Sequence, residues 1–169
     1  MTIAIIKGQE IISGILYRIN EDNVHSSIGV SELFADKRVV IFLGPAPFSR
    51  LDTEQANDYE LLSIEMLKHG IDEIFGIYVQ DAFVMNKFQE HIREQAGSAN
   101  VKFYGDGDGF FVRANQLSHD FTSSGLSVRS GRWAMVLNNN TVEHVAVDDY
   151  TLIDLTSARS ILKYLKNET

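Results

Sequence analysis

Residues 39–53 read VVIFLGPAPFSRLDT, the most informative stretch of the chain for its fold. Its first part, Val39 to Leu43, is an unbroken run of β-branched, aromatic and aliphatic side chains, which is typical of a parallel strand buried on both faces. The glycine and the two prolines that follow predict a tight turn. Apolar side chains then recur at helical spacing from Thr53 to Gly70. The stretch therefore predicts a strand, a turn and a helix, with Asp52 where the helix opens.

Strands and helices alternate along the rest of the chain. Residues 1–20 and 31–34 predict a β-rich opening and a short helical turn. Strands are expected at 71–79 and 101–104, and a helix at 81–95 carries Phe83 and Phe88 on its apolar stripe. Residues 133–137 and 142–147 predict a β-hairpin closed by an Asn-rich turn, and Thr156 is expected to cap the last helix. This order favours an α/β class, thioredoxin-like fold with a central mixed β-sheet flanked by helices.

Length and composition indicate one globular domain over residues 1–169, in which residues 1–30 form a β-rich N-terminal extension. The net charge of −8 and the lack of a basic cluster argue against nucleic acid as a partner. No apolar run approaches the length of a membrane span, and the opening residues MTIAIIKG are too short an apolar run for a signal peptide. We therefore expect no membrane association and a cytoplasmic location.

Four segments resemble type-five peroxiredoxins, members of the alkyl hydroperoxide reductase and redoxin (AhpC/TSA) superfamily. Residues 45–52 resemble the active-site motif Pro-x-x-x-Thr/Ser-x-x-Cys, in which Pro45 and Ser49 match and Asp52 stands at the position of the peroxide-attacking cysteine. Three further segments are similar to the family patterns Val-Asn-Asp-Ala-Phe-Val-Met, Asp-Gly-x-Gly-x-Phe-x-x-Ala and Arg-Ser-x-Arg-Tyr-Ala-Met-Val: they are residues 79–85, 106–114 and 129–136. The resemblance spans roughly residues 30 to 165, and the first thirty residues match poorly.

The resemblance implies a peroxidase site that lacks the cysteine sulfur on which its chemistry depends. In the family, a cysteine thiolate attacks a hydroperoxide and passes through sulfenic acid, with an arginine at the position of Arg132 contacting thiolate and peroxide. This chain contains no cysteine. A carboxylate can imitate only the charge of the thiolate, so we expect thiol peroxidase activity to be absent. We also expect Asp52 to be ionised at neutral pH, with Arg132 within reach of it.

Two hypotheses of function remain open, one a binding or regulatory protein and the other an enzyme. The first is a binding or regulatory pseudo-enzyme, in which Asp52 is only a helix N-cap and salt-bridge partner of Arg132. The alternative is a redoxin-family enzyme that uses a non-thiol site around these two residues. An open pocket, with Ser49, Phe48 and Arg50 around it, would favour a small oxyanion or carboxylate ligand or catalysis, and a sealed salt bridge would favour a structural remnant. The resemblance further implies a homodimer; the protein partner or ligand stays unknown.

Other groups of residues give little support for a metal site or a catalytic triad. The five histidines show no metal-ligand spacing, so neither a metal nor another cofactor is expected: His25, His69, His91, His119 and His144. Residues 106–109, DGDG, superficially look like a calcium loop, but Leu117 stands where a bidentate glutamate is needed. A triad of Ser49, His119 and Asp52 can be written on paper, although no nucleophile-elbow sequence supports it.

Overall fold

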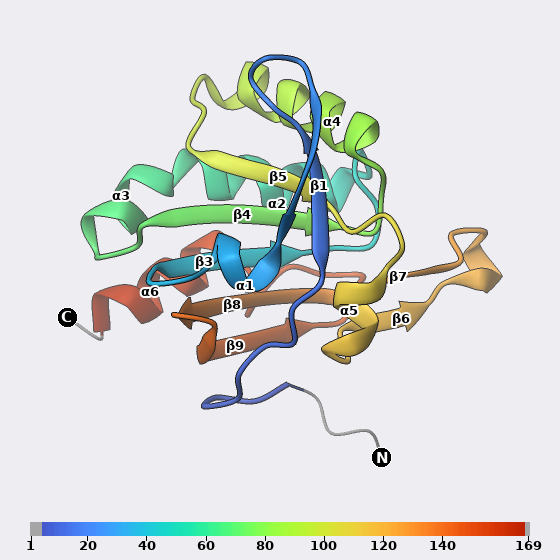
Figure 1. Cartoon of the computed structure of the whole chain (residues 1–169). Coiled ribbons are helices and arrows are strands. Elements are labelled where there is room, and N and C mark those ends of the chain that lie inside the picture. The colour runs from blue at the N-terminus through green and yellow to red at the C-terminus, as the bar shows by residue number, and fades with distance from the viewer. Residues whose placement is uncertain (1–4, 168–169) are drawn as a thin grey trace.

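The protein is described here from a computed structural model over residues 5–167, and it has an α/β architecture (Figure 1). Within these residues, seven strands form one mixed sheet in the order β2-β1-β5-β4-β3-β8-β9. Their bounds are β1 Ile15–Ile19, β2 His25–Gly29, β3 Arg38–Leu43, β4 Glu73–Tyr78, β5 Val101–Gly105, β8 Arg132–Asn138 and β9 Thr141–Asp148. The predicted α/β class with a mixed sheet flanked by helices is confirmed.

The helices and a small separate hairpin complete the described part of the chain. The helices are α1 Val30–Leu33, α2 Arg50–Leu61, α3 Ser63–Lys68, α4 Ala82–Ala96, α5 Phe110–Ala114 and α6 Ala158–Asn167. Strands β6 Ser118–Asp120 and β7 Val128–Ser130 pair with each other apart from the main sheet, and a 3₁₀ turn Thr122–Ser124 lies between them. The sequence did not predict this hairpin, whose strands have three residues each. No helix in residues 5–167 combines the length and the apolar character needed to cross a membrane.

The sheet is parallel at its centre and antiparallel at both edges. Strands β3, β4 and β5 run parallel, β8 pairs antiparallel with β3 and with β9, and β1 pairs antiparallel with β5 and β2. Residues 15–29 are therefore an edge of the main sheet. The turn of the β8–β9 hairpin contains Asn139 and Asn140 at φ 46° and 66°, the left-handed region that asparagine tolerates well.

The central strands bury both of their faces, as their unbroken apolar sequences predict. In β3, Val40 and Phe42 pack in the core under α2, α3, α4 and α6, whereas Ile41 and Leu43 pack in the core on the side of α1 and α5. Figure 1 shows these helices on the two sides of the sheet. Two cores on one sheet fix the direction in which β3 delivers the chain into the turn before α2.

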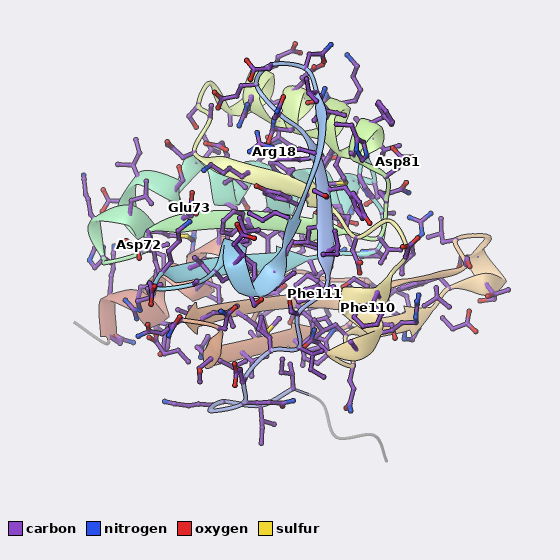
Figure 2. All side chains as sticks on the ribbon, in the orientation of Figure 1. Arg18, Asp72, Glu73, Asp81, Phe110 and Phe111 are labelled. Carbon is purple, nitrogen blue, oxygen red and sulfur yellow. The ribbon has the colours of Figure 1, made fainter. Side chains whose placement is uncertain are left out.

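The two ends of the parallel strands differ in what they carry. At the amino end of β4, Glu73 accepts hydrogen bonds from Lys37 at 2.9 Å and from Lys102 at 2.6 Å. Figure 2 shows Asp72 and Glu73 at this end, and Asp81 at the opposite end of the sheet. The turns that follow the carboxyl ends of β3, β4 and β5 lie at that opposite end, where ligand sites of open α/β sheets usually form.

The helix predicted from Thr53 to Gly70 begins earlier and breaks in the middle. Helix α2 starts at Arg50, because Ser49 caps it, and ends at Leu61. Helix α3 then starts at Ser63. The Ser63 hydroxyl donates to the Glu60 carbonyl oxygen at 2.6 Å, a local bond that competes with the helical ladder at the break.

Two further details differ from the sequence-based expectation. Phe83 was placed on the apolar stripe of its helix, but 65% of it is exposed, because Ala82, Met85 and Phe88 set the buried face of α4. Thr156 was expected to cap the last helix. The structure has α6 starting at Ala158, and the hydroxyl of Ser157 accepts from the Ser160 N–H at 3.1 Å, so Ser157 acts as the cap.

Candidate functional site

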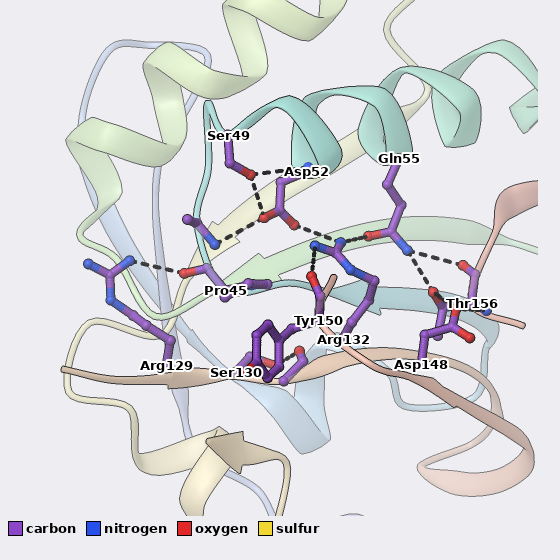
Figure 3. Close-up of polar contacts among 12 residues, drawn as sticks. Pro45, Ser49, Asp52, Gln55, Arg129, Ser130, Arg132, Asp148, Tyr150 and Thr156 are labelled. Atoms are coloured by element: carbon purple, nitrogen blue, oxygen red, sulfur yellow. Dashed lines mark hydrogen bonds and ion pairs between the residues drawn. The ribbon is translucent and has the colours of Figure 1, made fainter. Parts of the chain in front are cut away.

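A buried ion pair between Asp52 and Arg132 forms the centre of the candidate site (Figure 3). Arg132 Nη1 lies 3.0 Å from Asp52 Oδ1, and the side chains are 1% and 0% exposed. The sheet register explains the encounter: Leu43 at the end of β3 faces Trp133, so Arg132 lies one step further, beside the turn that leads into α2. Residues 80 positions apart meet because β8 is the antiparallel neighbour of β3.

The first turn of α2 holds the Asp52 carboxylate from the other side. Asp52 Oδ2 accepts hydrogen bonds from the Ala46 N–H at 3.1 Å and from the Ser49 hydroxyl at 2.9 Å. Ser49 Oγ in turn accepts from the Asp52 N–H at 3.2 Å. Ser49 is therefore the N-cap, which corrects the interpretation of Asp52 as the cap. Asp52 follows in the first turn, where the helix dipole favours a negative charge.

Gly44 makes the close approach of Asp52 possible. A Cβ atom built on Gly44 would lie 1.8 Å from Asp52 Oδ1 and 3.2 Å from Arg132 Nη1. Any side chain at this position would displace the ion pair, because non-bonded heavy atoms do not approach that closely. The glycine of the GPAP turn is thus required by packing against the carboxylate.

Arg132 continues the network towards the end of β9. Its Nη1 also donates to Gln55 Oε1 at 2.7 Å, and Gln55 Nε2 donates to the Thr156 carbonyl and hydroxyl oxygens, both at 3.1 Å. The Thr156 hydroxyl donates to Asp148 Oδ2 at 2.7 Å. A continuous hydrogen-bonded chain therefore joins α2, β8, β9 and the segment just before α6 (Figure 3).

Two buried tyrosines lie beside this network. Burial, and then the negative charge of Asp52, raise the pKa of Tyr78 well above its ordinary value. Burial, and then the charge of Asp148, do the same to the pKa of Tyr59, whose hydroxyl donates to the Thr156 carbonyl at 2.7 Å. Both phenols stay protonated at neutral pH, so neither supplies a base to the site.

The other predicted residues divide into two groups. Pro45 is buried at the site, and its carbonyl oxygen accepts from Arg129 Nη1 at 3.1 Å. Phe48 is half exposed and packs against Phe88, with ring centroids 5.2 Å apart. The Arg50 side chain is 81% exposed and pairs with Glu54 one turn along α2, so it does not reach the ion pair. The structure brings Pro45, Ser49, Asp52 and Arg132 together and leaves Arg50 in solvent.

Sequence reasoning missed several partners in this network: Gln55, Arg129, Asp148, Tyr150 and Thr156. Gln55 carried a signal, because it stands three residues after Asp52 and so faces the same side of the helix. Arg129 contacts the turn before α2, and Thr156 contacts α2, across separations of 84 and 101 residues along the chain. Asp148 and Tyr150 join the network through Thr156 and Arg132. No local pattern predicts contacts of that length.

The geometry does not support the Ser49–His119–Asp52 triad or a calcium loop at residues 106–109. The Ser49 hydroxyl is bonded to Asp52, whereas His119 packs against Phe121 and Tyr150 with ring centroids 4.5 and 5.2 Å apart. Among residues 5–167, no group of three or more His, Asp or Glu side chains could hold a metal ion. The Asp106 carboxylate accepts from the N–H groups of Phe111 and Val112 and so serves the turn into α5.

Similarity to known proteins is consistent and extends over most of the chain. No family model matches the sequence. A peroxiredoxin of Rhizobium etli is 36% identical over 146 residues, covering 80% of this chain and 78% of that protein. Peroxiredoxin-2C of Oryza sativa subsp. japonica is 32% identical over 139 residues, covering 82% and 84%.

Solved structures show the same likeness in three dimensions. Reduced Prx3 from Vibrio vulnificus in complex with H2O2 superposes with a TM-score of 0.85 at 30% identity, covering 95% of this chain and 99% of that one. Peroxiredoxin 5 from Alvinella pompejana superposes with a TM-score of 0.83 at 20% identity, which supports the fold alone. The fold is therefore the thioredoxin-like fold in its peroxiredoxin form.

Proposed function

The chain belongs to the peroxiredoxin family, and from this premise we propose that it is a pseudo-enzyme that keeps the family fold without thiol peroxidase chemistry. The observation that carries the proposal is a sealed Asp52–Arg132 ion pair in a chain without cysteine. Its role is then binding or regulation through its surface.

We place Asp52 at the position of the peroxide-attacking cysteine. The spacing of Pro45, Ser49 and Asp52 supports this assignment, as does the location of Asp52 in the first turn of α2. A thiolate there would meet the same helix dipole, the same hydroxyl and the same arginine that now surround the carboxylate. The carboxylate reproduces the charge of the thiolate and the contacts that the charge requires.

A carboxylate at position 52 keeps the negative charge of a thiolate but not its peroxidase chemistry. Peroxide reduction by this family oxidises sulfur to sulfenic acid, which then condenses with a thiol. A carboxylate has no corresponding oxidation step. In addition, both Asp52 oxygens accept hydrogen bonds from neighbouring groups, as expected of a carboxylate with a structural role.

The alternative of a non-thiol enzyme centred on this pair needs a substrate to reach it. Asp52 is 0% exposed, and Arg132 is 1% exposed. General acid–base catalysis requires the catalytic group within hydrogen-bond reach of the substrate. The sealed geometry therefore favours the structural remnant over the enzyme.

We further infer a cytoplasmic homodimer. Large aromatic side chains are exposed at the end of the sheet where the candidate site lies: Phe48 (50%), Phe83 (65%) and Phe110 (52%). Exposed apolar side chains of this size are commonly covered in an interface. Light scattering coupled to gel filtration tests this inference, and a monomer at all concentrations would contradict it.

Hydroperoxide consumption with dithiothreitol as reductant tests the pseudo-enzyme proposal. The unmodified protein is expected to show no turnover above buffer. Asp52→Cys is expected to show turnover, because the shorter cysteine side chain vacates the space of the carboxylate while Ser49 and Arg132 still surround that position. Ser124→Cys, on the exposed 3₁₀ turn, is the matched control for a thiol without the site.

Each result has a definite meaning. Turnover by the unmodified, cysteine-free protein would overturn the pseudo-enzyme proposal. If Asp52→Cys does no better than Ser124→Cys while its circular dichroism stays native, the site around position 52 has been rebuilt or is closed to hydroperoxide, and the search for a function moves to protein partners.

A further inference from the structure

Strand β9 lies at one edge of the seven-stranded sheet, and much of its outer side is open (Figure 1). On its inner side it pairs with β8. On its outer side, residues 5–167 supply no backbone hydrogen bond to Val145, Ala146 or Val147. Alternate residues of an edge strand direct their N–H and C=O groups away from the sheet, so an open edge can pair with a further strand.

The first residues of β9 already pair with a short extended segment of the same chain. Glu10 forms an antiparallel bridge with Thr141, the Val142 N–H donates to the Gln9 carbonyl oxygen at 2.9 Å, and the Gly8 N–H donates to the Val142 carbonyl oxygen at 2.7 Å. The segment turns at Gly8, whose φ of 89° lies in the left-handed region. This pairing shows that the edge accepts an extended strand, and it ends at Val142.

A groove of about 530 Å³ lies between the open part of β9 and helix α6. Residues 144–147 of β9 form one wall, and the other includes Leu155, Lys163 and Tyr164; we call it the β9 groove. Val147 is 48% exposed and Leu155 is 57% exposed, so the apolar part of the groove opens to solvent. None of the aromatic residues from which the homodimer is inferred lines this groove, so the two surfaces are separate.

The α6 side of the β9 groove is basic. Lys163 lines the groove, and Arg159, one turn earlier on α6, lines a neighbouring hollow together with Lys163. Both side chains are exposed, and the ion pairs among residues 5–167 include neither of them. The chain as a whole carries a net charge of −8, so a second copy would be repelled by the rest of the molecule. Charge complementarity at the groove favours an acidic partner of a different kind.

We propose that the β9 groove binds an extended acidic peptide segment of another protein, which adds to the sheet as a further strand antiparallel to β9. The segment ending at Gly8 sets this direction, because it already runs antiparallel to β9. Backbone hydrogen bonds hold the peptide, alternate apolar side chains fill the groove beside Leu155, and a carboxylate faces Lys163. The inference rests on the proposed function, because it supplies the partner class of a non-catalytic binding protein.

The probe is the capped peptide acetyl-Val-Thr-Val-Thr-Glu-Thr-amide, which carries its valines and its glutamate on one face. Nuclear magnetic resonance titration of the nitrogen-15 labelled protein measures binding, and amide hydrogen exchange measures new hydrogen bonds. We expect saturable shifts in β9 and slower exchange of outward N–H groups among residues 145–148, because pairing with the peptide protects them.

Two N-methylated peptides test whether the backbone carries the binding. One is methylated at the valine and glutamate amides and the other at the threonine amides, so that each blocks one edge of the peptide. Only one edge of the peptide can face β9. We therefore expect one methylated peptide to bind at least about tenfold more weakly than the parent and the other to bind like the parent.

A charge reversal tests the basic wall. Lys163→Glu is expected to weaken binding of the parent peptide about threefold, the size of effect that an exposed ion pair produces. Lys87→Glu, at an exposed lysine of α4, is the matched control and should leave binding unchanged. A peptide with lysine in place of glutamate should bind Lys163→Glu more tightly than it binds the unmodified protein.

No saturable shift in β9, or equally tight binding of the parent and both methylated peptides, would overturn the proposal. Equal effects of Lys163→Glu and Lys87→Glu would do the same. Protection of residues 145–148 that rises with protein concentration in the absence of peptide would assign the edge to a second copy instead. The peroxide assay is independent of these measurements: peroxidase activity of the unmodified protein would remove the proposed function, and absent peptide binding would remove only the partner assignment.

Discussion

Helix α2 buries two carboxylates, one near each end, and holds them by different means. Asp52 in the first turn is 0% exposed and pairs with the Arg132 guanidinium at 3.0 Å. Glu60 in the last turn is 1% exposed and accepts instead from the Ser98 hydroxyl at 2.8 Å and from two N–H groups before and in β5, those of Asn100 and Val101, at 2.6 and 2.9 Å.

The two carboxylates differ in which partner groups lose their hydrogen bonds or counter-charge when the carboxylate is removed. Loss of Glu60 exposes neutral donors, which water can partly satisfy near the surface loop 97–100. Loss of either member of the Asp52–Arg132 pair leaves an uncompensated charge in the core, and this costs far more than a missing hydrogen bond. Neither partner of a buried ion pair can therefore be replaced alone without a large loss of stability, whether or not the pair takes part in catalysis.

The largest expected effect comes from removing the cation. Arg132→Met keeps much of the side-chain volume but leaves Asp52 buried without a counter-charge, and it should lower the free energy of unfolding by about 3–5 kcal/mol. Urea denaturation measures it. Arg113→Met, at an exposed arginine of α5, is the control.

A double variant sharpens this result. Asp52→Leu combined with Arg132→Met removes both charges, so it should recover much of the stability that Arg132→Met alone loses. If the single variant costs no more than the Arg113→Met control, the ion pair does not constrain the core and the comparison with Glu60 fails.

Next in size is the effect of crowding the pair. Gly44→Ala places a Cβ atom 1.8 Å from Asp52 Oδ1, which forces the carboxylate away from Arg132 and should cost about 3 kcal/mol. Thermal unfolding measures it. Gly29→Ala is the matched control, because a Cβ atom there meets nothing within 4 Å. Equal melting temperatures for the two variants would be incompatible with the close packing described for Gly44.

A smaller effect is expected at the other end of α2. Glu60→Gln keeps the shape but turns one acceptor into a donor that faces other donors, and it should cost about 2 kcal/mol. Chemical denaturation beside Arg132→Met provides the direct comparison of the two carboxylates. A loss for Glu60→Gln that equals or exceeds the loss for Arg132→Met would reverse the ranking.

The smallest effect is a pH dependence at the surface end of the network. Burial alone would raise the pKa of Asp148, but hydrogen bonds from residues 154–156 together lower it below 3.8. A carboxyl group with a lowered pKa in the folded protein contributes stability above pH 3.8, and this contribution disappears as the pH falls further. Asp148→Asn should therefore reduce stability at neutral pH, with the gap closing in acid.

Melting temperatures across that pH range measure the dependence, and Asp22→Asn, in the exposed turn after β1, is the control. A constant gap between Asp148→Asn and the unmodified protein down to the lowest pH would contradict the assignment.

Local patterns predicted the central elements well. The apolar run of β3, the turn after it and the Asn-rich turn of the last hairpin appear in the structure because short-range sterics and burial on both faces decide them. Boundaries were less accurate: α2 starts three residues before Thr53, since the Ser49 cap outweighs the later onset of apolar spacing. The phase of α4 was misjudged at Phe83 because a small alanine defines the buried side.

Thiol chemistry is excluded at the level of the sequence, because cysteine is absent from all 169 residues. It also marked Asp52 and Arg132 as a pair through their family resemblance. That the pair is sealed follows only from the tertiary structure. Exposure depends on which strands and loops cover a side chain, and those coverings come from residues far away along the chain.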